Sequence, residues 1–188
     1  MNKAIFLDRD GTINIDKAYL SKIEDFEYIP NVIEGLRILQ DSGFLLIVVT
    51  NQSGIARGYY TEADFLKLND WMLNDLKSQG INIAKVYYCP HYSSGKIEKY
   101  IMDCECRKPK LGMYEDAIQE FDIAVEQSFT IGDKIRDLSL CKKYNCHGYL
   151  ISNLEKETVI NDVKNGQYRN IKFAEDLLSA AKKIVGGK

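Results

Sequence analysis

The amino-acid sequence predicts an α/β fold in which a central, mainly parallel sheet lies between layers of helices. Short apolar runs alternate along the chain with stretches of helical spacing, which is typical of strands joined by crossover helices. The apolar runs are largely unbroken by polar residues, as expected of parallel strands that are buried on both faces. Because 188 residues are an ordinary length for one domain, we expect a single domain over residues 1–188.

Five apolar runs are the expected strands, and helical patterns fill most of the intervals between them. The strands are expected at residues 4–7, 45–49, 85–88, 129–131 and 149–151. The helices are expected at residues 31–41, 61–79, 111–121, 135–145 and 173–185. Thr61 has Asp64 three residues further on, a spacing that is typical of a helix start.

Composition and charge exclude several classes of protein. The 25 basic and 27 acidic residues give a net charge of -2, so there is no general electrostatic footprint for nucleic acid or for an anionic membrane. The longest clean apolar run, residues 44–49, is far shorter than the ~20 residues that cross a bilayer. The first residues lack a secretory signal, and five cysteines are an odd number for a disulfide framework. We therefore expect a cytoplasmic monomer that binds neither nucleic acid nor membranes.

Two carboxylates follow the first expected strand. Asp8 and Asp10 lie next to Gly11, at the carboxyl end of a strand, where open α/β sheets bind their ligands. Gly11 allows the backbone to leave the strand, so that both carboxylates can face one pocket. Asp8 is then the candidate nucleophile, which would form an aspartyl-phosphate, and Asp10 is the candidate general acid and base. The alternative is an ordinary surface turn.

Two further segments supply groups that suit a phosphate. Residues 50–54 follow the second strand with hydroxyl, amide and backbone N–H donors, which can bind phosphate oxygens. Arg107 and Lys108 place two cations shortly before a helix. Each segment also has an ordinary interpretation, as a polar loop and as a solvated basic pair.

A third acidic residue follows the fourth strand and indicates a metal. Asp133 can complete an oxygen shell with Asp8 and the backbone carbonyl of Asp10, with several water molecules in the remaining positions. This sparse set of oxygen ligands is the coordination that magnesium prefers. We therefore expect Mg²⁺ as a cofactor.

A long irregular loop carries a second candidate metal site. Cys89, His91, Cys104 and Cys106 fall between residues 89 and 106, and four such ligands can form a closed tetrahedral zinc site. A closed site has no open position, so we expect the Zn²⁺ to be structural and to fix the loop that ends at Arg107. Chance clustering of buried thiols is the alternative. The two remaining cysteines are expected to be core residues.

These motifs together resemble those of the haloacid dehalogenase superfamily of phosphotransferases. The resemblance rests on Asp8-x-Asp10-Gly11-Thr12, on Thr50 after an apolar strand, on Lys108 and on Gly132-Asp133-x-x-x-Asp137. It implies a three-layer Rossmann-like fold without a large cap domain. It also implies that Thr50 and Lys108 hold the transferring phosphoryl group and that Arg107 helps to choose the substrate. The other implied substrate contacts are Asp16 to Tyr19, Asn51, Gln52, Ser53 and Lys134.

Three longer segments narrow the resemblance to a branch of sugar-bisphosphate phosphatases, which also carries a zinc loop. The segments are residues 6–14, 49–58 and 87–91. The resemblance implies a small sugar bisphosphate as the substrate. Two alternatives stay open: a histidinol-phosphate phosphatase, which shares the branch and its zinc loop, and a zinc-held binding module without catalysis, which would leave the acidic strand ends unexplained.

Overall fold

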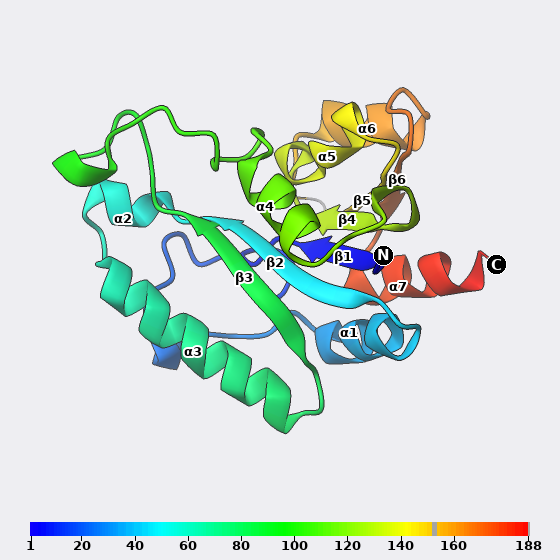
Figure 1. Ribbon diagram of the computed structural model, residues 1–188, viewed down its shortest axis with the longest axis horizontal. Helices are drawn as coiled ribbons and strands as arrows, with labels where there is room; N and C mark the ends of the chain where they lie inside the picture. The colour runs from blue at the N-terminus through cyan, green and yellow to red at the C-terminus, as the bar shows by residue number, and fades with distance from the viewer. Residues whose placement is uncertain (152–153, 188) are drawn as a thin grey trace.

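A single six-stranded sheet forms the centre of the molecule (Figure 1). The computed structural model describes residues 1–151 and 154–187. The strand order is β3-β2-β1-β4-β5-β6, and each neighbouring pair is parallel. The strands are β1 (Ala4–Leu7), β2 (Leu45–Asn51), β3 (Ile83–Cys89), β4 (Phe129–Gly132), β5 (His147–Ile151) and β6 (Ile171–Ala174).

Helices cover both faces of the sheet, which gives the expected three layers. The helices are α1 (Val32–Asp41), α2 (Ser53–Arg57), α3 (Glu62–Ser78), α4 (Gly112–Glu120), α5 (Leu140–Lys143), α6 (Glu157–Lys164) and α7 (Leu177–Gly186). One apolar cluster joins the sheet to α1, α3 and α7, and a second joins the opposite face to α4, α5 and α6. No helix in the described part of the chain is long and apolar enough to cross a membrane.

Strand β1 shows why the strand runs are unbroken in the sequence. Ile5 and Leu7 belong to one apolar cluster, whereas Ala4 and Phe6 belong to the other. Successive side chains of a strand point to opposite faces, and both faces of this strand are buried. Every position must therefore be apolar, and no alternation of apolar and polar residues is left to see.

The five expected strands are confirmed, but the C-terminal part of the chain was predicted wrongly. The chain forms a sixth strand, β6, where the final helix was expected to begin, and that helix starts at Leu177 instead. Asp176 caps it, because the Asp176 carboxylate accepts a hydrogen bond from the backbone N–H of Ser179 at 2.7 Å. The helix expected at residues 135–145 is divided into a 3₁₀ turn (Ile135–Leu138) and the short α5. Helices α2 and α6 were not expected.

The topology brings the predicted site residues to one edge of the sheet. Strand β1 pairs with β2 on one side and with β4 on the other, and all three run in the same direction. Their carboxyl ends therefore meet at the same edge, and Asp8, Thr50 and Asp133 lie at or directly after these ends. This is the position at which open α/β sheets bind ligands.

Candidate active site

A cavity of about 340 Å³ opens at the carboxyl ends of β1, β2 and β4. Of the residues to which we assigned a catalytic or substrate-binding role, all but Lys17 line it. Those that line it are Asp8, Asp10, Asp16, Ala18, Tyr19, Thr50, Asn51, Gln52, Ser53, Arg107, Lys108 and Lys134. The roles of these residues remain predictions, but their gathering in one cavity is a property of the fold.

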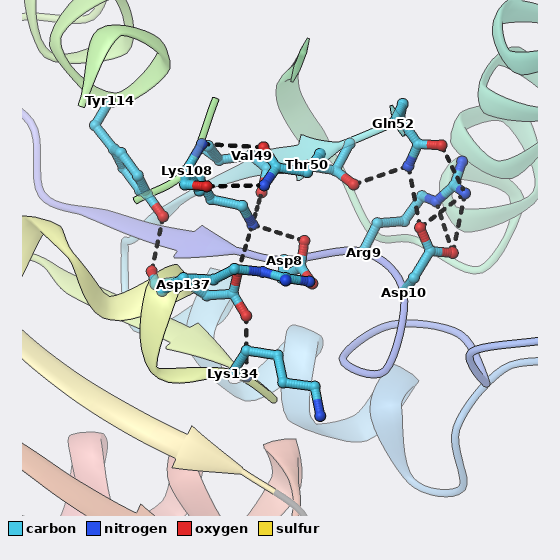
Figure 2. Close-up of polar contacts among 12 residues, drawn as sticks. Asp8, Arg9, Asp10, Val49, Thr50, Gln52, Lys108, Tyr114, Lys134 and Asp137 are labelled. Carbon is cyan, nitrogen blue, oxygen red and sulfur yellow. Dashed lines mark hydrogen bonds and ion pairs between the residues drawn. The ribbon is translucent and has the colours of Figure 1, made fainter. Parts of the chain in front are cut away.

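Lys108 lies between two buried carboxylates at the inner end of the cavity (Figure 2). Its ammonium nitrogen Nζ is 2.8 Å from Oδ1 of Asp8 and 2.8 Å from Oδ1 of Asp137, and it donates to the backbone carbonyl of Val49 at 2.6 Å. The contacts with Asp8 and Val49 are hydrogen bonds, and the contact with Asp137 is an ion pair. The exposed fraction of Lys108 is 2%, and water therefore screens its charge very little.

The carboxylates around Lys108 carry more negative charge than one cation can balance. Burial and the neighbouring charge of Asp137 raise the pKa of Asp8 to about 6, although Lys108 opposes this shift. Burial and the charges of Asp8 and Asp137 raise the pKa of Asp133 to about 8. Burial alone would lower the pKa of Lys108, but Asp137 and Asp8 raise it above its ordinary value. The protein therefore gathers three carboxyl groups around one cation. Burial removes them from water and disfavours their charged forms.

A divalent cation fits this arrangement. Asp8, Asp133 and Asp137 each offer a carboxylate oxygen, and these oxygens lie within 4.8 Å of one another. Hard oxygen ligands of this kind suit Mg²⁺, and its charge would permit all three groups to ionise. The group differs from the predicted magnesium ligands in one respect, because it contains the carboxylate of Asp137 and not that of Asp10. The predicted ligand from Asp10 is its backbone carbonyl, and that contact remains a prediction.

The carboxylate of Asp10 is turned toward a separate polar network (Figure 2). Nη2 of Arg9 donates to both oxygens of Asp10 at 2.9 Å, and the side-chain amides of Asn14 and Gln52 each donate to it at 3.0 Å. Burial opposes the charge, but Arg9 and these hydrogen bonds hold the pKa of Asp10 below its ordinary value. These contacts therefore fix Asp10 in position and favour its ionised form.

Asn51, the last residue of β2, and Gln52, which follows it, support other parts of the site. The amide of Asn51 exchanges two hydrogen bonds with the backbone of Lys108, at 3.0 and 3.1 Å, and thereby ties β2 to the loop before α4. Gln52 donates to Oγ1 of Thr50 at 2.9 Å and accepts from the hydroxyl of Tyr60 at 2.6 Å. Asn51 and Gln52 were predicted as substrate contacts, and both side chains are already occupied in positioning their neighbours.

The backbone turn at Gly11 lies close to the carboxylate of Asp133. Gly11 has φ +84°, and a Cβ atom at this position would come within 2.6 Å of Oδ2 of Asp133. Glycine adopts this left-handed conformation without the steric cost that other residues meet. Gly11 thus serves both the turn after Asp8 and the close approach of the Asp133 carboxylate.

Sequence reasoning assigned no role to four polar or charged residues that also line the cavity. These are Arg57, Tyr60, Arg136 and Asp137. Asp137 lies in the motif that we quoted for the family resemblance, so its spacing from Asp133 was an available signal. Arg57 also lies in a segment that we quoted for the resemblance, residues 49–58, whereas Tyr60 and Arg136 reach the cavity through tertiary packing, which no spacing in the sequence indicates.

The predicted zinc ligands come together in the loop after β3. Their ligand atoms all lie within 4.8 Å of one another, although the cluster joins residues up to 17 positions apart. Sγ of Cys106 is 2.9 Å from Sγ of Cys89 and 3.2 Å from Sγ of Cys104, and Nδ1 of His91 is 3.3 Å from Sγ of Cys106. The cluster can hold a metal. Cys141 and Cys146 do not belong to this group of ligands and are buried in the core, as expected.

The loop that carries the predicted zinc ligands is joined directly to the cavity. Arg107 follows Cys106 in the chain, and its Nη1 donates to the backbone carbonyl of His91 at 3.3 Å. Lys108 is the next residue. The position of the metal ligands therefore affects the position of both cations.

Comparisons with known proteins agree with this geometry. A family model described as Polynucleotide kinase 3 phosphatase matches residues 3–175. A D-glycero-beta-D-manno-heptose-1,7-bisphosphate 7-phosphatase of Haemophilus influenzae is 54% identical over 138 residues, which are 73% of this chain and 74% of the relative. A D-glycero-alpha-D-manno-heptose-1,7-bisphosphate 7-phosphatase of Campylobacter jejuni is 46% identical over 155 residues, which are 82% of this chain and 85% of the relative.

A solved structure matches nearly the whole fold. It is the crystal structure of a D,D-heptose 1,7-bisphosphate phosphatase from B. bronchiseptica complexed with magnesium and phosphate. It has a TM-score of 0.82 and 26% sequence identity, and the match covers 99% of each chain. The chain thus shares its three-layer fold with a solved phosphatase.

Proposed function

Because the chain belongs to the family of D-glycero-D-manno-heptose-1,7-bisphosphate 7-phosphatases, with a haloacid dehalogenase-like fold, we propose that it removes the 7-phosphate of D-glycero-D-manno-heptose 1,7-bisphosphate. This hydrolysis would serve the synthesis of nucleotide-activated heptose. The observation that carries the proposal is the buried group of Asp8, Lys108 and Asp137 at the inner end of the cavity. A phosphoryl acceptor beside a fixed cation is what the reaction needs.

The reaction proceeds in two displacements at phosphorus. An oxygen of Asp8 attacks the phosphorus atom, and the bond between phosphorus and the oxygen of C7 breaks. Asp10, which must enter this step in its protonated form, donates its proton to that leaving oxygen, so no alkoxide is released. Asp10 then accepts a proton from a water molecule, which attacks the aspartyl-phosphate and regenerates the Asp8 carboxylate with inorganic phosphate. Thr50 and Lys108 hold the phosphoryl group in place during both steps.

The network around Asp10 supports the second step. Arg9 and the two amides favour the ionised form of this carboxyl group, and a general base must be ionised when it accepts a proton. The same contacts fix the direction in which Asp10 points. A fixed direction matters because proton transfer requires a hydrogen-bonded approach of ~3 Å between the two heavy atoms.

Two metal ions complete the proposal. Mg²⁺ would be held by Asp8, Asp133 and the carbonyl of Asp10, and when bound it supplies charge neutralisation for the phosphoryl group. Zn²⁺ would be held by Cys89, His91, Cys104 and Cys106 and would be structural. Each group of donors fits its ion by atom type. Oxygen donors suit magnesium, and sulfur and nitrogen donors suit zinc.

A panel of phosphate-release assays tests the proposed substrate. The panel contains both anomers of heptose 1,7-bisphosphate, histidinol phosphate and an oligonucleotide with a 3′-phosphate, each with Mg²⁺ present. We expect the highest kcat/KM with one heptose bisphosphate anomer. Higher kcat/KM with histidinol phosphate would contradict the proposal in favour of the alternative enzyme. No magnesium-dependent release from any compound would favour a binding module, although the known relatives are phosphatases. The cytoplasmic location and the monomeric state remain predictions.

A further inference from the structure

The cations that line the cavity fall into two groups. Lys108 is paired with Asp8 and Asp137 at 2.8 Å, Lys134 lies 3.9 Å from Asp133, and Arg136 lies 4.0 Å from Asp137. Arg57 and Arg107 line the same cavity. Across residues 1–151 and 154–187, neither of these two arginines has an acidic partner within ion-pair distance. Two guanidinium groups thus face the cavity with their charge unbalanced by the protein.

Both arginines contact the aromatic ring of Tyr92. The guanidinium carbon of Arg57, the last residue of α2, lies 4.0 Å from the centroid of this ring, and that of Arg107 lies 5.2 Å from the same centroid. Arg57 also lies 5.8 Å from the ring centroid of Tyr19. Stacking of this kind favours a guanidinium on an aromatic face and restricts its orientation. The two arginines are therefore placed before any ligand arrives.

One hydrogen-bond donor of Arg57 is also unused. Its Nε is buried and has no hydrogen-bond partner in the part of the chain that the structure describes. A buried donor without a partner is costly, and two cations on one ring repel each other. An anion with several oxygens relieves both costs, because a guanidinium binds phosphate oxygens through two parallel N–H groups.

The position of this pair matches the second phosphate of the substrate. The reacting phosphoryl group must lie against Asp8 and Lys108, whose exposed fractions are 8% and 2%. Arg57 and Arg107 are only partly buried, and Tyr19 beside Arg57 is 43% exposed. The arginine pair therefore lies nearer to the mouth of the cavity than the reacting groups, and a substrate with one phosphate could reach only one of the two places.

We propose that Arg57, together with Arg107, binds the phosphate group that is not hydrolysed, with Tyr92 as their common support. This inference rests on the proposed function, because it assumes a sugar bisphosphate as the substrate. Arg57 is then a specificity-determining residue. It makes the enzyme prefer a bisphosphate over the corresponding monophosphate, and it also binds the sugar 1-phosphate product.

The test compares two substrates on the same variant. We measure kcat/KM for phosphate release from heptose 1,7-bisphosphate and from heptose 7-phosphate with the wild type and with Arg57→Gln. Loss of a charge-assisted hydrogen bond should lower kcat/KM for the bisphosphate on the order of 10- to 100-fold, mainly through KM. The monophosphate should change by less than about 3-fold, since it lacks the group that Arg57 contacts.

Matched variants complete the design. Arg37→Gln removes an exposed arginine that donates to the carbonyl of Gln79 on another surface, and it should leave the substrate ratio at its wild-type value. Arg57→Lys keeps the charge and should recover part of the preference. If Arg57→Gln does not fold, Tyr92→Leu provides the same comparison by removing the shared support. Inhibition by heptose 1-phosphate should weaken in parallel with the loss of preference.

Two outcomes would overturn the inference. Both can be distinguished from a failure of the proposed function. Equal losses with both substrates in Arg57→Gln would show a general role for Arg57 in folding or catalysis. Unchanged kcat/KM with both substrates would show that Arg57 binds no phosphate. The proposed function fails separately, if the wild-type protein releases no phosphate from heptose 1,7-bisphosphate, and that result is obtained before any variant is made.

Discussion

The ammonium of Lys108 lies 2.8 Å from the carboxylate of Asp8, although the two residues are 100 positions apart in the chain. The contact joins the end of β1 to the segment that leaves the zinc loop. Both side chains are almost fully buried. If one partner is removed, water therefore cannot solvate the charge of the other. The same ion pair thus connects the stability of the fold with the positions of the proposed nucleophile and of the loop that carries the proposed zinc ligands.

Replacing Lys108 should cost stability as well as activity. Lys108→Met leaves the buried carboxylates of Asp8 and Asp137 without their cation, and removal of one partner from a buried ion pair costs roughly 3–5 kcal/mol in the free energy of unfolding. Urea denaturation without added metal measures this quantity. Lys85→Met is the matched control, because its pair with Glu120 is exposed and should contribute less than about 1 kcal/mol. Equal losses in the two variants would refute the special role of the buried pair.

Gly11 should be essential for a reason that other glycines do not share. Gly11→Ala combines a positive φ with a Cβ atom 2.6 Å from Oδ2 of Asp133, so we expect loss of most of the phosphatase activity. Gly80 has φ +79° but nothing within 4 Å of the added Cβ. Gly80→Ala should therefore cost only the conformational strain, about 1–2 kcal/mol, and keep its kcat. Wild-type kcat in Gly11→Ala would show that the position of Asp133 is not critical.

Removal of a zinc ligand should act on the cavity through Arg107. We expect Cys104→Ser to lose bound zinc, measured by metal analysis of the purified protein, and to raise KM for the bisphosphate because Arg107 is no longer fixed. Cys141→Ser is the control, since Cys141 lies in the core beside Thr130, at 3.3 Å from its Oγ1. The control should keep its zinc content. A zinc-free Cys104→Ser protein with an unchanged KM would argue against any coupling between the metal and the substrate site.

The parts of the fold that the sequence predicts well are those with one dominant physical signal. Strand β1 is buried on both faces, so its apolar run has the bounds of the strand itself. Strand β6 is at the edge of the sheet, where Lys172 is exposed and only Ile171 and Ala174 are buried. Such a mixed pattern resembles the start of an amphipathic helix, and this is why the strand was missed.

The residues of the site also divide into those that the sequence predicts and those that it misses. Asp8 and Asp133 were predictable because parallel strands bring their carboxyl ends to one edge of a sheet. The pairing of Asp137 with Lys108 depends on the 3₁₀ turn after β4, and the stacking of Arg57 on Tyr92 depends on the path of the zinc loop. These contacts join distant segments, and no periodicity in the sequence reports on them.

The most direct test of the central claim is to trap the phosphorylated enzyme. The wild type is mixed with heptose 1,7-bisphosphate and Mg²⁺, quenched in acid during turnover, digested and analysed by mass spectrometry. We predict one phosphoryl group on the peptide that contains Asp8, and no such peptide with Asp8→Asn, whose phosphate release should fall at least ~10³-fold. An Asp8→Asn protein that folds and still releases phosphate at the wild-type rate would contradict the account.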